Sequence, residues 1–202
     1  MTRRSLALRG PLDLAATLGP LVHGRGDRTI RLRPREAWLT MRLASGPATL
    51  RLQRPSPTEL DATAWGDGAD EALAGVEALV GEHDEPERLV PRHPVVRELA
   101  RRYAGLRLPR TGRVFAALVP SVIEQKVTGT EAFRAYAALL RQYGEPAPGP
   151  AGLLLPPKPE TLTALPYHAY HPLGIERRRA EVLRRAAPRA TWLEALLDSV
   201  EA

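Results

Sequence analysis

The spacing of the apolar residues changes near residue 83, and this change limits the folds that the chain can adopt. Before it, apolar and polar residues alternate in short runs, such as 37–43 and 48–53, which is typical of half-buried strands. After it, apolar residues recur every three or four positions, as in helices that bury one face. The sequence therefore predicts an α+β domain followed by an all-α domain.

The predicted N-terminal domain covers residues 1–82 and consists of a small antiparallel sheet with two helices. Trp38 and Trp65 are expected to pack in the sheet core. A polar, proline-bearing segment at 83–92 is predicted as a linker. Strands are predicted at 5–9, 29–33, 37–43 and 48–53, and helices at 11–24 and 71–80.

Residues 93–202 predict a helical bundle. Thr128 and Glu131 have the spacing of a capping box, so a helix is expected to begin there and to end at Gly144. The segment 145–159 is rich in proline and glycine and is predicted as a loop. The other predicted helices lie at 93–105, 111–123, 160–165, 176–187 and 191–200.

The charge of the chain is carried by arginine. The net charge is +6, and 29 residues are basic, of which only Lys126 and Lys158 are lysines. The segment 88–113 holds eight arginines against one acid, Glu98. Such clustering indicates a polyanionic partner, although the arginine usage of a GC-rich genome would produce the same composition.

Composition also excludes several classes of protein. No run of about eighteen uncharged apolar residues occurs, so a membrane span is not predicted, and no apolar run follows the basic N-terminus to form a secretory signal. The chain has no cysteine, which rules out disulfide scaffolds, thiolate zinc sites and cysteine nucleophiles. We expect a cytoplasmic protein.

Three stretches carry a resemblance to a known family. They are the strand–helix–strands order of the N-terminal domain, the run 121–129 (SVIEQKVTG) followed by a helix that reaches Tyr143-Gly144, and the run 173–180 (LGIERRRA). Together they resemble the 3-methyladenine DNA glycosylase II-like branch of the helix-hairpin-helix DNA glycosylase superfamily. The resemblance covers most of the chain.

The resemblance implies a base-excision-repair enzyme that binds duplex DNA, flips an alkylated base out of the stack and hydrolyses its glycosidic bond. It implies a monomer that needs no metal or organic cofactor. The position after Gln125 is a minor-groove wedge in the family and usually apolar, whereas here it is Lys126, which could enter the gap or hold a phosphate. The implied DNA-binding residues are Gln125, Lys126, Thr128, Arg177, Arg178 and Arg184.

The family's hairpin and the catalytic Asp that follows it are not found after Gly144. The helical domain is therefore expected to be incomplete at its C-terminal end, and no catalytic residue is assigned. Glu194, Asp198 and Glu201 have the spacing of a solvated helix face rather than of a catalytic group. His168 and His171 are read as loop histidines rather than metal ligands, because no further ligand cluster accompanies them.

Two alternatives to an active glycosylase remain. One is a non-catalytic DNA-binding remnant of the family that recognises distorted or abasic duplex. The other is a helix-turn-helix regulator built on 115–127 and 130–143. The second is disfavoured, because only Arg134 near the start of the would-be recognition helix could reach a base edge.

Overall fold

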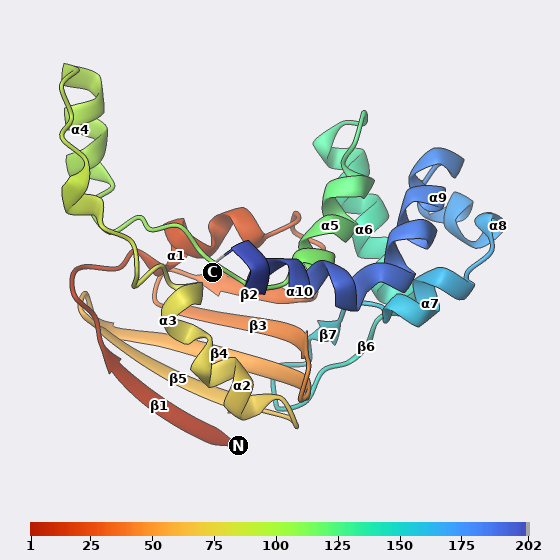
Figure 1. Ribbon diagram of the computed structural model, residues 1–202, viewed down its shortest axis with the longest axis horizontal. Coiled ribbons are helices and arrows are strands. Elements are labelled where there is room, and N and C mark those ends of the chain that lie inside the picture. Colours follow the sequence, from red (N-terminus) through yellow and green to blue (C-terminus); the bar gives the residue numbers. More distant parts are fainter. Residues whose placement is uncertain (201–202) are drawn as a thin grey trace. The chain divides into compact units, whose positions relative to one another are not determined.

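A five-stranded antiparallel sheet forms the centre of the N-terminal part (Figure 1). The computed structural model describes residues 1–200, with side chains through residue 196. The strand order is β1-β5-β4-β3-β2, so β2 to β5 form a meander and β1 pairs with its last strand. The strands are β1 (Thr2–Ala7), β2 (Ile30–Arg33), β3 (Glu36–Leu43), β4 (Gly46–Ser56) and β5 (Glu59–Trp65).

One face of this sheet is covered by short helices. Helix α1 (Leu14–Leu18) packs on β2 and β3, and α2 (Ala69–Ala74) packs on β1, β4 and β5. In Figure 1, α2 and α3 (Val76–Leu79) cross in front of the strands. Alternation along the strands turns small and branched side chains to this covered face. Its buried residues are Ala37, Leu39, Ala48, Leu50, Leu52, Leu60, Ala62 and Ala64.

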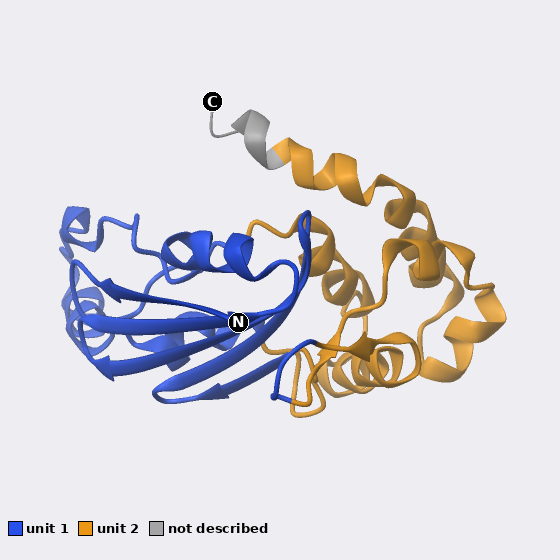
Figure 2. Ribbon diagram, turned by 90° about the horizontal axis from the view of Figure 1, so that it is seen from below, with its two compact units in different colours: residues 1–21, 30–111, 148–151 blue, residues 22–29, 112–147, 152–202 orange. Residues whose placement is uncertain are grey.

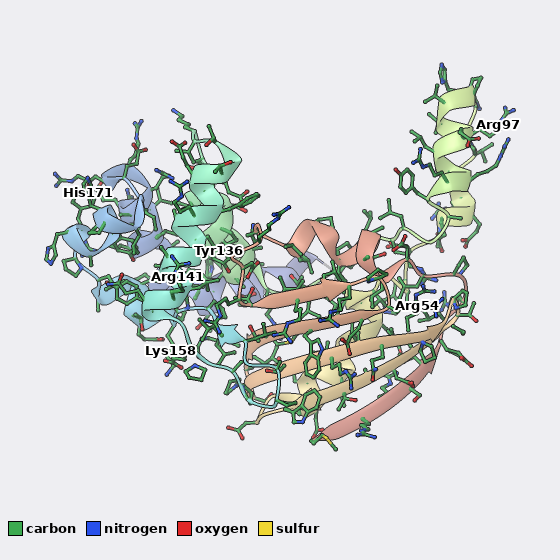
Figure 3. The ribbon with its side chains drawn as sticks, turned by 180° about the vertical axis from the view of Figure 1, so that it is seen from behind. Arg54, Arg97, Tyr136, Arg141, Lys158 and His171 are labelled. Carbon is green, nitrogen blue, oxygen red and sulfur yellow. The ribbon has the colours of Figure 1, made fainter. Side chains whose placement is uncertain are left out.

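The opposite face of the sheet carries aromatic and charged side chains, and Figure 3 shows the sheet from that side. The rings of Trp38 and Trp65 stack with centroids 5.3 Å apart, and the Arg51 guanidinium lies 5.1 Å from the Trp38 centroid. Arg51 also donates to the Glu36 carboxylate at 2.6 and 2.8 Å. The prediction that both tryptophans pack in the sheet core is therefore wrong, because they stack on each other on the face without helices.

The α+β class and the antiparallel sheet are confirmed, with differences in detail. The first strand lies earlier than predicted, and β5 was not predicted. The predicted helix 11–24 is limited to α1 and the 3-10 turn η1 (Gly19–Leu21), because Asp13 caps α1 by accepting the Ala16 N–H at 2.9 Å and Gly-Pro follows it. The predicted helix 71–80 is divided at Gly75 into α2 and α3.

Helix α4 (Pro94–Arg102) follows the short turn η2 (Pro86–Arg88) and buries none of its residues. One side of α4 is apolar, yet Val95, Val96 and Leu99 are exposed on it. After α4, the Arg107 side chain holds the chain against earlier segments of the N-terminal part. This buried guanidinium pairs with the equally buried Glu82 and donates to the Gly10 carbonyl at 2.8 Å.

The remaining elements are mainly helices around one apolar core. Leu139, Leu162, Tyr170 and Ile175 are fully buried there, and the Tyr170 hydroxyl donates to the Leu162 carbonyl at 2.6 Å. The predicted loop 145–159 contains a two-stranded ladder, so this part is not all-α. The elements are α5 (Val114–Ile123), α6 (Gly129–Tyr143), β6 (Glu145–Pro146), β7 (Leu154–Leu155), α7 (Pro159–Ala164), α8 (Tyr167–Tyr170), η3 (His171–Leu173), α9 (Arg177–Ala186), η4 (Ala187–Arg189) and α10 (Ala190–Val200).

By their contacts the residues form two units, coloured in Figure 2. Unit 1 consists of residues 1–21, 30–111 and 148–151, and unit 2 consists of residues 22–29, 112–147 and 152–202. Both units are discontinuous in sequence, and the domain limits of 1–82, 83–92 and 93–202 stay a prediction. Within the described part of the chain, no helix has the length and apolar character needed to cross a membrane.

Candidate nucleic-acid interface

The turn between α5 and α6 displays two of the predicted DNA-binding residues, Gln125 and Lys126, and both side chains are exposed. Helix α5 closes with the Glu124 N–H donating to the Pro120 carbonyl at 2.9 Å. Lys126 then adopts a φ of 58° and is the one described non-glycine residue with a left-handed backbone. Such a conformation costs about 1–3 kcal/mol and persists where surrounding contacts fix it. The turn is therefore a constrained element that projects a cation.

Thr128, the third residue of the predicted site in this region, forms the N-cap of α6. Its Oγ1 accepts the Glu131 N–H at 3.3 Å, and the Glu131 carboxylate accepts the Thr128 N–H at 3.0 Å. The Thr128 hydroxyl also donates to this carboxylate at 2.9 Å. These hydrogen bonds lower the pKa of Glu131. The predicted capping box is confirmed, and the Thr128 hydroxyl proton is already engaged within the protein.

Arg179 is a buried residue of this region that the sequence reasoning missed. Its side chain is 7% exposed, and it donates to the Ile123 carbonyl at 2.6 Å and to the Gly174 carbonyl at 3.2 Å. It therefore ties the last residue of α5 to the turn that precedes α9. The available signal was helical spacing, since Arg179 falls on the same stripe as the buried Ala180 and Leu183.

The other predicted arginines lie on the solvent side of α9. Arg177, Arg178 and Arg184 are all exposed, as expected. Arg177 is engaged with Glu181 at 3.0 Å and lies 5.8 Å from the centroid of the Tyr167 ring. Such exposed pairs are worth about 0–1 kcal/mol, so these guanidinium groups can exchange partners for a phosphate at little cost.

The structure brings part of the predicted site together. The contact of Arg179 with the Ile123 carbonyl places the start of α9 beside the end of α5, so Arg177 and Arg178 lie on the element next to the Gln125–Lys126 turn. Arg184 lies about two turns further along α9, and no contact in the described part of the chain joins it to the turn.

The structure describes one of the three C-terminal carboxylates that the sequence analysis assigned to a solvated helix face. Glu194 accepts the N–H groups of Val114 and Phe115 at 2.7 and 3.0 Å, so it caps the start of α5 and the prediction of a solvated position is wrong for it. The side chain of Asp198, and Glu201 as a whole, lie outside the described residues. His168 lies in α8 and His171 begins η3, so both sit in helical turns rather than in a loop.

No metal centre is visible among the described residues, since these contain no group of three or more His, Cys, Asp or Glu side chains that could hold an ion. The His171 ring packs edge-on against the Tyr167 ring, with centroids 6.0 Å apart.

Comparison of the sequence with family models gives no match, and comparison with curated proteins gives none either. The structure does match solved structures. The 3-methyladenine DNA glycosylase from Archaeoglobus fulgidus aligns with a TM-score of 0.75 and 17% identity over 93% of this chain. MBOgg1, solved in complex with a low-affinity DNA ligand, aligns with a TM-score of 0.69 and 15% identity over 94% of this chain.

A third match is more distant. The 8-oxoguanine glycosylase/lyase of Clostridium acetobutylicum, solved with double-stranded DNA, aligns with a TM-score of 0.53 and 11% identity over 79% of this chain. This chain spans less than two thirds of the length of these proteins, namely 66%, 63% and 64%. At such identities the similarity establishes the fold, which is that of DNA glycosylases.

Proposed function

We propose that this chain is a DNA-repair glycosylase-like protein that binds duplex DNA and flips alkylated bases for hydrolytic removal. The observation that carries the proposal is the glycosylase fold over 93% of the chain, combined with the constrained turn that projects Gln125 and Lys126. A flipped base leaves a gap in the stack, and a rigid protein element must occupy or brace that gap. The turn between α5 and α6 is such an element.

The exposed arginines of α9 support binding to the DNA backbone. Phosphate contacts from Arg177, Arg178, Arg184 and Arg185 would release condensed counterions, so the logarithm of the binding constant would fall with the logarithm of salt concentration with a slope of about −3.6. The protein is proposed to act as a cytoplasmic monomer, and neither binding nor hydrolysis by water requires a cofactor.

Hydrolysis of the glycosidic bond requires a carboxylate beside the sugar, because positive charge develops there as the bond breaks. Three carboxylates of the described part that come close to α5 and α6 are engaged in structural contacts. Glu124 contacts the His23 ring, Glu131 belongs to the capping box, and Glu194 caps α5. This favours a second candidate function, in which the chain recognises distorted or abasic duplex without cleaving it.

Two measurements separate these functions. The first is release of free base from methylated DNA under excess protein, which an active glycosylase produces and a binding remnant does not. The second is affinity for a duplex with a tetrahydrofuran abasic analogue relative to the same duplex without it. Both functions predict a preference for the abasic duplex, so equal affinities would refute the proposal.

The role of Lys126 is tested by two substitutions. Lys126→Ala removes both the stem and the charge, whereas Lys126→Leu keeps an apolar stem that can fill a gap. If Lys126 contacts a phosphate, both variants reduce the salt slope by about 0.9. If its stem fills the gap, Lys126→Leu retains the preference for abasic duplex and Lys126→Ala loses it. Arg141→Ala on α6 serves as the control for the loss of one exposed cation.

A further inference from the structure

The segment 22–29 lies between elements of unit 1 in the sequence but belongs by its contacts to unit 2 (Figure 2). Two glycines bring it close to α6. A Cβ atom at Gly24, where φ is 81°, would lie 2.6 Å from the Cβ of Phe133, and one at Gly26 would lie 2.8 Å from the Cβ of Ala137. Larger residues at these positions would push the segment away from the helix.

Asp27 fixes the internal shape of this segment. Its buried carboxylate accepts the His23 N–H at 3.0 Å, the Thr29 N–H at 2.9 Å and the Thr29 hydroxyl at 2.7 Å. With both ends of the segment held by one side chain, the backbone at His23 has little freedom. The direction of the His23 side chain is therefore set before it meets any partner outside the segment.

The His23 ring is held between two side chains of unit 2. Its Nδ1 lies 2.7 Å from the Oε1 atom of Glu124, and its edge packs on the Tyr136 ring with centroids 5.3 Å apart. Tyr136, labelled in Figure 3, is buried, and this burial raises the pKa of its hydroxyl. A buried, neutral tyrosine offers a fixed wall, so the His23 ring can reach Glu124 but cannot swing inward.

Glu124 is the first residue after α5 and stands two positions before the left-handed Lys126. The Glu124 side chain is 39% exposed. An ion pair or hydrogen bond with a partner as exposed as this contributes about 0–1 kcal/mol to stability. The contact is thus too weak to be important for folding. It is well placed for another task, because Arg179 holds the carbonyl of the preceding residue, Ile123, and together the two contacts restrain the start of the turn.

We infer that His23 is a positioning residue for Lys126. Through Glu124 it restrains the turn 124–127 and keeps Lys126 in the orientation in which it meets DNA. This inference rests on the proposed function for its consequence in DNA binding. The restraint itself is a property of the free protein and is testable without DNA.

Cleavage by a lysine-specific endoprotease measures the restraint directly. The chain has two lysines, and Lys158 precedes Pro159, a bond that such proteases do not cut readily, so Lys126 is the effective single site. A protease needs a locally opened backbone, so its cleavage rate reports the opening of the turn. We expect His23→Ala and Glu124→Ala to accelerate cleavage by a similar factor, roughly twofold to fivefold.

The effects of the two substitutions on the cleavage rate must also be non-additive. The double variant is expected to cleave no faster than either single variant, because each removes the same contact. Glu124→Gln keeps a hydrogen-bonding oxygen and should restore much of the protection, whereas the control His168→Ala, at an exposed histidine of α8, should leave the rate unchanged. Independent, multiplying effects of the two single substitutions, or unchanged cleavage in both, would overturn the inference.

The DNA measurement uses the same variants. His23→Ala and Glu124→Ala are expected to reduce the preference for the abasic duplex by a similar factor while the unfolding midpoint stays the same. If His23 had a purely structural role, its substitution would instead lower the unfolding midpoint and would weaken binding to the abasic and the intact duplex alike. That result would contradict the inference. Faster cleavage with an unchanged preference would also contradict it. A wild-type protein without any preference would refute the proposed function, and the cleavage rates would still decide whether His23 restrains the turn.

Discussion

Replacing Arg179 with methionine tests whether the end of α5 depends on a buried guanidinium. Methionine retains a similar unbranched stem, so the packing around it changes little. The substitution removes both hydrogen bonds and leaves the carbonyl oxygens of Ile123 and Gly174 without these donors. Because the side chain is 7% exposed, water cannot easily replace it.

The expected loss follows from the two distances. A hydrogen bond from a charged group contributes about 1.5–3 kcal/mol, and the 2.6 Å bond to the Ile123 carbonyl falls in this class. The longer 3.2 Å bond to the Gly174 carbonyl is weaker and adds about 1 kcal/mol. Removing a buried charge also recovers part of its desolvation cost. We therefore expect a net loss of about 2–3 kcal/mol in the free energy of unfolding.

Urea unfolding followed by far-ultraviolet circular dichroism measures this loss. The matched control is Arg178→Met, at an exposed neighbour on the same helix, which should change the free energy of unfolding by less than about 0.5 kcal/mol. The urea dependence should be the same in both variants, because neither alters the surface exposed on unfolding. If Arg179→Met unfolds at the same urea concentration as its control, the guanidinium does not hold the end of α5 and the reasoning fails.

Three further predictions concern other parts of the chain. Thr128→Ala should cost about 0.5–2 kcal/mol of stability through loss of the helix cap, measured by urea unfolding, and Thr130→Ala beside it should not. Burial raises the pKa of Tyr170 to about 12; the unfolded chain ionises first, so stability should fall between about pH 10 and 12, and Tyr170→Phe should flatten this part of the pH profile. The double variant Val96→Glu/Leu99→Glu should reduce binding of a hydrophobic dye without moving the unfolding midpoint, and a lower midpoint would mean that this side of α4 is packed.

Local chemistry made several elements predictable. The capping box at Thr128 was correct because both of its partners lie within four residues, and the antiparallel sheet was predicted because turns and alternation are also local signals. Strand β5 was missed although Leu60, Ala62 and Ala64 alternate, since two of these three residues are alanines with little hydrophobic contrast. The end of α1 was misplaced because the apolar spacing continues past Leu18, whereas Gly19-Pro20 ends the α-helix there.

The candidate site was only partly predictable for a different reason. Gln125 and Lys126 were found from a short motif, and their exposure follows from their place after an apolar helix. The contact between His23 and Glu124 joins residues 101 positions apart, and nothing in either local sequence indicates the other. Arg179 could have been separated from its neighbours by helical spacing, but its partners are backbone carbonyls, which carry no signature in the sequence.

The alternation of the two units along the chain constrains how the protein can be made and how it can change. Each unit has three segments, so the polypeptide passes between them five times. On the ribosome, Gly24 emerges 109 residues before its partner Phe133, a wait of about 5–20 s at ordinary translation rates. Trp65 is likewise synthesised well before Gly149, the residue that approaches its ring. Unit 1 cannot be completed during synthesis until residues 22–29 and 112–147 of unit 2 have been made, and a recombination break anywhere from residue 22 to residue 151 would cut through both units.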